Sequence, residues 1–297
     1  MEPMENCPVE TRELTRYYGR QPALVGCTLS VSQGEVFGLL GPNGSGKTTL
    51  VRLLLGFLKP TSGTARIQGQ DAWREAVAVH RLVGYLPGEV RLYRRMTGRA
   101  ILTFFARLRG QQPAAALALA RRLRVELDRP AAALSTGMRQ KLALAVALAP
   151  PVPLLVLDEP TANLDPSARE EVIALVREAR GRGQTVLFSS HVLDEVERAS
   201  DRVGILREGR LLHVQGMAEL RRRHRIQARL TGPLPPVPAR LAAELAVRSH
   251  DHSVTMETGG DLAPLLGWLA TLPMAEVRIE PVGLRAVYER FHRAEPA

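Results

Sequence analysis

Short apolar runs alternate with helical stretches over the first two thirds of the chain. Four of these runs are rich in leucine, β-branched or aromatic residues, as buried strands are: 35–40, 154–157, 185–188 and 202–206. Most of them lead through a turn into a helical stretch. This order predicts a largely parallel α/β sheet with helices on its faces.

A mostly helical pattern begins at residue 74 and is punctuated by glycine and proline. We expect it to form a helical insertion at about 74–150. The insertion interrupts a sheet domain that spans 1–216.

The last third of the chain has a different order of elements. A basic stretch at 217–225 is interpreted as a linker, and 226–297 as a small accessory domain. Its expected strands are 226–230, one before residue 253, 253–257 and 276–280, and its expected helices are 239–245, 261–270 and 284–291. This order predicts an α+β unit of the ferredoxin-like kind. The proline-rich segment 232–238 is expected to be a stiff connector.

Composition narrows the class of protein. The chain has 297 residues, of which 45% are hydrophobic and 24% charged. These values support a sizeable core and exclude wholesale disorder, a collagen helix and a small disulfide scaffold. Cys7 and Cys27 lack the spacing of metal ligands.

The net charge of +10 suggests a nucleic acid or an anionic membrane as partner. Only three of the 40 basic residues are lysines, however, and the chain is also rich in alanine and leucine. That bias is expected of a GC-rich genome. We therefore interpret the charge as background composition rather than as a binding signal.

No segment of the sequence predicts membrane insertion. Acidic residues interrupt the N-terminal region, which argues against a targeting signal. The longest apolar stretch, 142–157, contains three prolines and is shorter than the roughly 20 residues that a bilayer requires. Any membrane role is expected to depend on a partner.

A glycine-rich segment follows the strand expected at 35–40 and precedes a helical stretch at 49–58. Backbone N–H groups in such a loop turn inward on a phosphate, the lysine reaches the β and γ phosphates, and the threonine hydroxyl can hold Mg²⁺. The candidate nucleotide-binding residues are Gly41, Pro42, Asn43, Gly44, Ser45, Gly46, Lys47, Thr48 and the adjacent Thr49.

Two carboxylates end the apolar strand at 154–157. Adjacent acids at the end of a buried strand are costly unless a cation faces them, and a magnesium–nucleotide complex supplies one. We assign Asp158, together with Thr48, to the metal, and Glu159 to orienting and polarising the attacking water. The alternative is an acidic helix cap, which the neighbouring phosphate loop disfavours.

His191 follows the strand expected at 185–188. Parallel strands deliver their carboxyl ends to one edge of a sheet, so His191 is expected near Glu159 and the γ-phosphate. In the alternative interpretation, Ser190 caps the next helix and His191 is merely exposed.

The segment 134–141, with the sequence Leu-Ser-Thr-Gly-Met-Arg-Gln-Lys, precedes a helix expected at 142–149. Together with the phosphate loop, Asp158-Glu159, the loop at 163–166 and His191, in this order, it resembles the ATP-binding subunits of ATP-binding cassette (ABC) transporters. The resemblance covers about residues 8–216. It implies an ATPase fold with an antiparallel β subdomain and the helical insertion, and ATP and Mg²⁺ as cofactors.

The resemblance also implies roles that residue spacing alone does not give. Tyr18 is similar to the aromatic residue that stacks on adenine, although Tyr17 is a neighbouring candidate and a core position is the alternative. Ser135 and Gly137 resemble signature residues that touch ATP held by the opposite subunit. Asp165 resembles the loop aspartate that couples the two subunits.

One position departs from the family pattern. After the segment 84–87 the family usually places a glutamine that contacts Mg²⁺ and the attacking water, but this chain has Gly88, followed by Glu89. We expect water or Glu89 to substitute, and a competent but slower ATPase.

The expected partners are a second copy of the chain, in a dimer that sandwiches ATP, and separate membrane permease subunits docked near 89–108. The resemblance extends to exporters of the type-2 drug and antibiotic group, which implies export from the cytoplasmic face of the membrane. An ABC-type ATPase that acts on nucleic acid or ribosomes is the alternative, supported by the basic run 221–225. That run lacks interleaved aromatic residues, so no nucleic-acid partner is expected. A third class, a regulatory module that holds ATP without hydrolysing it, is disfavoured by Glu159 and His191.

Overall fold

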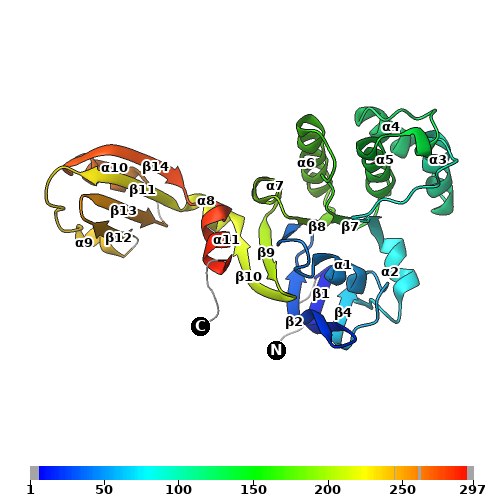
Figure 1. Cartoon of the computed structure of the whole chain (residues 1–297), viewed down its shortest axis with the longest axis horizontal. Coiled ribbons are helices and arrows are strands. Elements are labelled where there is room, and N and C mark those ends of the chain that lie inside the picture. Colours follow the sequence, from blue (N-terminus) through cyan, green and yellow to red (C-terminus); the bar gives the residue numbers. More distant parts are fainter. Residues whose placement is uncertain (1–6, 244, 260–261, 293–297) are drawn as a thin grey trace. The chain divides into compact units, whose positions relative to one another are not determined.

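The computed structural model describes residues 7–243, 245–259 and 262–292. The chain forms two compact units, Met1–Val214 and Gln215–Ala297, and each is described by itself. Figure 1 labels their helices and strands.

A six-stranded sheet forms the centre of the first unit, with strand order β10-β9-β3-β8-β7-β6. From β9 to β6, each of its neighbouring pairs is parallel. The strands are β3 (Val36–Leu40), β6 (Val83–Leu86), β7 (Leu154–Asp158), β8 (Thr185–Ser190), β9 (Arg202–Arg207) and β10 (Arg210–Gly216). The four strands expected from the apolar runs are all present, with small shifts of their ends.

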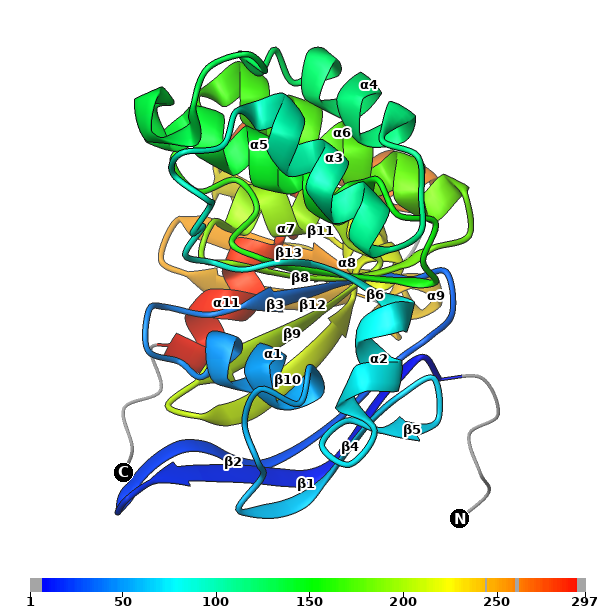
Figure 2. The same ribbon diagram turned by 90° about the vertical axis from the view of Figure 1, so that its right-hand side faces the viewer.

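A second, antiparallel sheet has the order β2-β1-β4-β5. Its strands are β1 (Val9–Tyr18), β2 (Gln21–Val31), β4 (Ser62–Ile67) and β5 (Gln70–Asp71). Helix α1 (Lys47–Leu54) lies between the two sheets (Figure 2). Its buried leucines join one hydrophobic core with Leu14 and Leu24 of the antiparallel sheet and Val156 of the parallel sheet. The antiparallel β subdomain implied by the family resemblance is thus present.

The other face of the parallel sheet is covered by helices, and the helical insertion lies on that same side of the sheet (Figure 2). The helices of this unit after α1 are α2 (Ala76–Leu82), α3 (Gly98–Leu108), α4 (Ala114–Arg122), η1 (Ala131–Ala133), α5 (Thr136–Leu148), α6 (Pro166–Gly181) and α7 (Leu193–Ala199).

The predicted helical insertion at 74–150 is wrong at one point, because it includes strand β6. Val83 and Leu86 are buried and their strand pairs in parallel with β7 at the edge of the sheet. The helix expected at 142–149 also begins earlier, at Thr136, and the helix expected at 49–58 lies at Lys47–Leu54. No helix in the described ranges has the length and apolar character of a membrane span.

The second unit contains an antiparallel sheet of order β12-β13-β11-β14. Its elements are α8 (Met217–Arg222), β11 (His224–Leu230), α9 (Ala239–Ala242), β12 (Leu245–His250), β13 (Ser253–Thr258), α10 (Leu262–Leu269), β14 (Met274–Pro281) and α11 (Leu284–His292). From β11 to β14 they follow the β-α-β-β-α-β order. The expected ends at residues 261 and 297 lie outside the described residues.

Two expectations for this unit are wrong in detail. Residues 217–225 are not a linker, because they form α8 and the start of β11, where Arg225 pairs with Glu257 at 2.7 Å. The helix expected at 239–245 stops at Ala242, since Leu245 is buried in the core at the start of β12.

Candidate functional site

The phosphate loop connects the end of β3 to the start of α1, as the sequence predicts. Gly46 immediately precedes α1 with a φ of +105°, a left-handed conformation that favours glycine. A Cβ on Gly41 would lie 2.4 Å from the carbonyl oxygen of Leu206 and 2.5 Å from Ser45 Oγ. Both glycines are therefore required by the local geometry of the loop.

Lys47 turns back into this loop and is 5% exposed. Its Nζ donates to the carbonyl oxygens of Gly41 at 2.7 Å and Pro42 at 3.2 Å, and lies 3.3 Å from Glu159 Oε1. Ser45 Oγ is buried and has no hydrogen-bond partner within the described part of the chain. The loop thus offers a cation and an unsatisfied hydroxyl, which suit a phosphate group.

The fully buried carboxylate of Asp158 at the end of β7 accepts two hydrogen bonds. Thr48 Oγ1 donates to one of its oxygens at 2.9 Å and Ser189 Oγ to the other at 2.5 Å. These oxygen donors suit Mg²⁺, which is typically bound by one or two carboxylates together with waters and substrate phosphates. Among the described residues no group of three or more His, Cys, Asp or Glu could hold a metal by itself. The chemistry of the donors fits a magnesium ion that arrives with a nucleotide.

Glu159 follows Asp158 directly, at the edge of the sheet where strands β7 and β8 end. Its Oε2 is 2.8 Å from His191 Nδ1, and its backbone N–H donates to Ser189 Oγ at 3.0 Å. Glu159 has a φ of +50°, a left-handed conformation that is unusual for a residue with a side chain. The structure therefore brings Lys47, Glu159 and His191 together, and places Asp158 beside them.

The alternative role of Ser190, as the cap of the next helix, is wrong, because α7 follows Val192 and no side chain caps it. The Ser190 hydroxyl accepts from the Val192 N–H at 3.0 Å and donates to the buried Glu195 at 2.9 Å, just before α7. Ser190 thus shapes the turn that carries His191. His191 is half exposed but contacts Glu159, so it is not merely a surface residue.

Ser135 and Asp165 contact residues other than Lys47, Glu159 and His191. Ser135 is exposed and caps α5, and its Oγ accepts from the Met138 N–H at 3.1 Å. Asp165 caps α6 through the Ala168 N–H at 2.9 Å, and Lys141 Nζ lies 3.6 Å from its carboxylate. The bond from Ala168 and the charge of Lys141 lower the pKa of Asp165.

Tyr18 ends β1 on the surface. Its ring is 43% exposed, and the Arg16 guanidinium lies 5.1 Å from the ring centroid. Tyr17 is also exposed, so neither tyrosine occupies the core position that was the alternative. Both remain available for stacking on a base.

The structure does not support Glu89 as a replacement for the missing glutamine. Glu89 is exposed and its carboxylate pairs with Arg91 at 2.9 Å. A Cβ on Gly88, by contrast, would lie 3.1 Å from Asp158 Oδ2. Position 88 therefore adjoins the proposed magnesium ligand, whereas the side chain of Glu89 is engaged elsewhere.

Sequence reasoning missed three residues of this neighbourhood. Ser189 bonds both Asp158 and the Glu159 backbone, and the buried Gln140 donates to the carbonyl oxygens of Glu159 and Pro160. Burial and the charge of Asp158 raise the pKa of Tyr85 to about 12. No signal in the sequence identifies Gln140, because its burial and its two contacts appear only in the folded chain.

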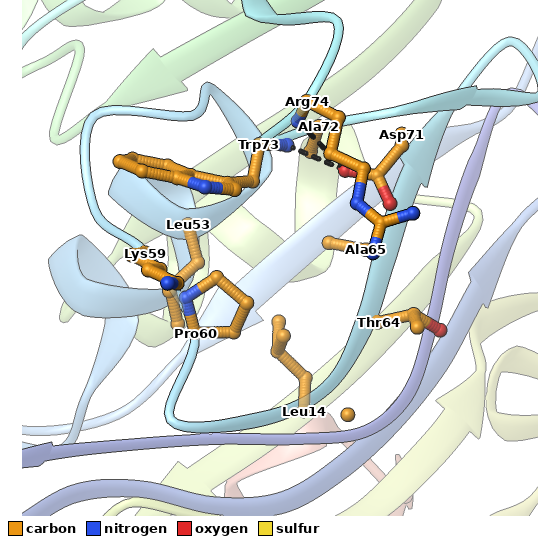
Figure 3. A pocket seen from close by; sticks show the side chains of 11 residues that line it. Leu14, Leu53, Lys59, Pro60, Thr64, Ala65, Asp71, Ala72, Trp73 and Arg74 are labelled. Carbon is orange, nitrogen blue, oxygen red and sulfur yellow. Dashed lines mark hydrogen bonds between the residues drawn. The ribbon is translucent and has the colours of Figure 1, made fainter.

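A separate hollow of about 270 Å³ lies beside the antiparallel sheet (Figure 3). Lys59 and Pro60 line one side of it, and Trp73 and Arg74 lie across from them. None of the phosphate-loop residues contributes to its lining. This hollow is distinct from the candidate site.

Comparisons with known proteins agree with the geometry. The family model for ABC transporters matches residues 24–162. The bacitracin transport ATP-binding protein of Bacillus licheniformis is 36% identical over 73% of this chain and 72% of its own length. A Nod factor export ATP-binding protein of Burkholderia orbicola is 33% identical over 97% of this chain and 98% of its own length.

A third relative, a daunorubicin resistance ATP-binding protein of Streptomyces coeruleorubidus, is 39% identical over 68% of this chain and 66% of its own length. Among solved structures, the ATP-binding subunit of an ABC transporter superimposes with a TM-score of 0.66 at 30% identity. That match covers 72% of this chain and 92% of the other.

Proposed function

This chain belongs to the ABC transporter family as an ATP-binding subunit, and from that premise we propose that it hydrolyses ATP to power export through a separate membrane permease. The observation that carries the proposal is the convergence of Lys47 and His191 on the carboxylate of Glu159, beside the Thr48–Asp158 pair. Bacitracin transport, Nod factor export and daunorubicin resistance are named for relatives, and the Nod factor protein supports export as the direction.

Each residue of the cluster has a chemical task in this proposal. The loop N–H groups and Lys47 bind and orient the phosphates. Glu159 orients the attacking water by accepting a hydrogen bond from it. His191 positions the Glu159 carboxylate by contacting its Oε2 atom. Thr48 and Asp158 hold Mg²⁺, which neutralises charge on the phosphates when bound.

The test of this catalytic proposal is phosphate release by the purified chain. Wild type is expected to release phosphate from ATP only with Mg²⁺. Glu159→Gln, which keeps the shape but not the basicity, should lower the rate by about 10²-fold or more. Lys47→Ala should abolish nucleotide binding as well, because the loop loses its cation. Full activity in Glu159→Gln would contradict the assignment of the base.

We further propose that two copies sandwich two ATP molecules. Ser135 and Gly137 shape the exposed tip of α5, and no contact links Ser135 to Lys47 among the described residues. A two-fold dimer in which each Ser135 faces the partner's nucleotide would form two identical sites.

The permease is proposed to dock on the segment 89–108 of the helical insertion. Tyr93, Phe104 and Leu108 are exposed there, and the Tyr93 and Phe104 rings pack at 5.6 Å between centroids. Exposed aromatic side chains that cluster in this way are typical of protein interfaces. The chain would then be peripheral, held at the cytoplasmic face of the membrane by its permease.

A further inference from the structure

Helix α5 contacts the carboxylate loop, residues 159–165, at three places. Gln140 Nε2 donates to the carbonyl oxygen of Glu159 at 3.3 Å and to that of Pro160 at 3.2 Å. Lys141 Nζ lies 3.6 Å from Asp165 Oδ2. A Cβ on Gly137 would lie 2.9 Å from the carbonyl oxygen of Asn163, so the helix backbone approaches the loop closely.

The three helix positions, 137, 140 and 141, are three and four residues apart and therefore share one face of α5. The same helix begins at Thr136 and is capped by Ser135. Ser135 and the face that contacts the carboxylate loop therefore belong to one helix. The helix is well packed, because seven of its 13 residues are buried.

The carboxylate loop has a conformation that depends on its surroundings. Glu159 has a φ of +50°, and a left-handed residue with a long side chain persists only where neighbouring contacts stabilise it. Gln140 is one of those contacts. It is 3% exposed and is the only side chain for which the described residues show hydrogen bonds to both the Glu159 and the Pro160 carbonyl.

We propose that Gln140 is a positioning residue that sets the catalytic carboxylate of its own subunit according to the position of α5. The proposal rests on the ATP-sandwich dimer described above, in which Ser135 of the same helix engages the ATP bound by the other subunit. Occupancy of one site is thereby communicated through α5 to Glu159 at the other.

Mixed dimers test this coupling because they separate the two subunits' contributions. A trace of full-length chain with intact Glu159 is mixed with a large excess of Glu159→Gln chain, so that each active subunit pairs with an inactive one. Phosphate release is measured per active subunit over a range of ATP concentrations. Gln140→Met, which keeps the side-chain length but removes both hydrogen bonds, is placed either on the active or on the inactive subunit.

We expect Gln140→Met on the active subunit to lower kcat by about tenfold with KM for ATP nearly unchanged. The same substitution on the inactive subunit should leave the rate within about twofold of the unmodified pair. A slower rate when Gln140→Met lies on the inactive subunit would show that the residue acts on the partner's ATP instead. No change in either arrangement would also overturn the proposal.

Gln184→Met is the matched control. Gln184 likewise donates its amide to a backbone carbonyl, that of Val152 at 2.7 Å, but it precedes β8 at the other end of the strand from the site. The control should lower the melting temperature while leaving kcat unchanged. An equal loss of kcat in both variants would assign the effect of Gln140 to general stability.

Failure of the dimer itself would give a different result. If no sandwich forms, excess Glu159→Gln chain will not change the rate of the trace wild-type subunit at all. If the excess chain changes that rate but placement of Gln140→Met does not matter, the dimer stands and only the role of Gln140 is wrong.

Discussion

The ammonium of Lys47 is surrounded by three oxygen atoms, two of them backbone carbonyls and the third from Glu159. Both charged side chains are largely buried, and a buried pair is tolerated only when good geometry offsets the lost hydration. A phosphate that enters the loop competes with Glu159 for the same ammonium. Its arrival would release the carboxylate to accept a hydrogen bond from water, with His191 still holding the other oxygen.

Gly88→Gln is the substitution that tests the departure from the family pattern. The new side chain would begin 3.1 Å from Asp158 Oδ2, next to the proposed magnesium ligand, once Asp158 yields by a few tenths of an ångström. We expect kcat for ATP hydrolysis to rise by about two- to tenfold, since one added polar contact to the transition state contributes about 1 kcal/mol. Steady-state phosphate release measures it.

Gly88→Ala is the control for the steric part of this change. It adds the crowded Cβ without the amide, so its rate should equal or fall below that of wild type. If Gly88→Ala and Gly88→Gln alter the rate equally, the amide has no role. An unchanged rate in Gly88→Gln would mean that position 88 does not contribute to turnover in this chain.

The phosphate loop, Asp158, Glu159 and His191 were predictable because each is a local pattern at the end of an apolar strand. Ser189 and Gln140 were not, since their contacts depend on the register between β7 and β8 and on how α5 packs. Glu89, or water, in place of the missing glutamine stays a prediction, and the contacts of Glu89 do not support it. Its sequence position adjoins Gly88, but its side chain turns to Arg91.

The elements show why local patterns mark strands better than helix starts. Helix α5 begins at Thr136, six residues before the apolar run, because Ser135 caps it and Arg139 donates to the Leu134 carbonyl at 2.7 Å. Strand β6 was missed because its four residues lie inside a helical pattern. Only pairing with β7 reveals it as the sheet edge.

An ionic contact joins the helical insertion to the central ATPase fold. Arg122 of α4 makes two bonds to Glu178 of α6, at 2.6 and 2.7 Å, and also contacts Glu171. The bonds from Arg122 lower the pKa of Glu178 below its usual value of 4.5. Because the pair is substantially exposed, its contribution is expected to be at most about 1 kcal/mol.

A double-mutant cycle with Arg122→Met and Glu178→Gln measures this contribution through the free energy of unfolding. A carboxyl whose pKa is lowered by folding stabilises the protein above its unfolded pKa, and that stabilisation disappears as pH falls through the folded pKa. We therefore expect a coupling energy at pH 7 that vanishes well below pH 4.5 and shrinks in high salt. A coupling energy that does not depend on pH would indicate packing rather than charge.

At the scale of the whole molecule, the order of elements was more predictable than their arrangement. The apolar patterns predicted most of the strands and helices of the second unit. The strand order β12-β13-β11-β14 depends on contacts between residues far apart in the chain, such as Ile226 with Met256 and Ile279. The basic stretch 217–225 was interpreted as a linker because charge alone does not distinguish an exposed linker from a helix and strand whose arginines pair with Glu257.

The incomplete site of a single chain leads to a prediction about assembly. Each copy has one phosphate loop and one Ser135, and a closed two-fold dimer pairs both sets. Glu159→Gln should bind ATP without hydrolysing it, so its ATP-bound dimers accumulate. Light scattering with saturating ATP and Mg²⁺ should give twice the chain mass of 32.6 kDa. Lys47→Ala/Glu159→Gln should stay at the single mass, because without the lysine no triphosphate is held between the subunits. A Glu159→Gln chain that remains monomeric under these conditions would contradict the sandwich.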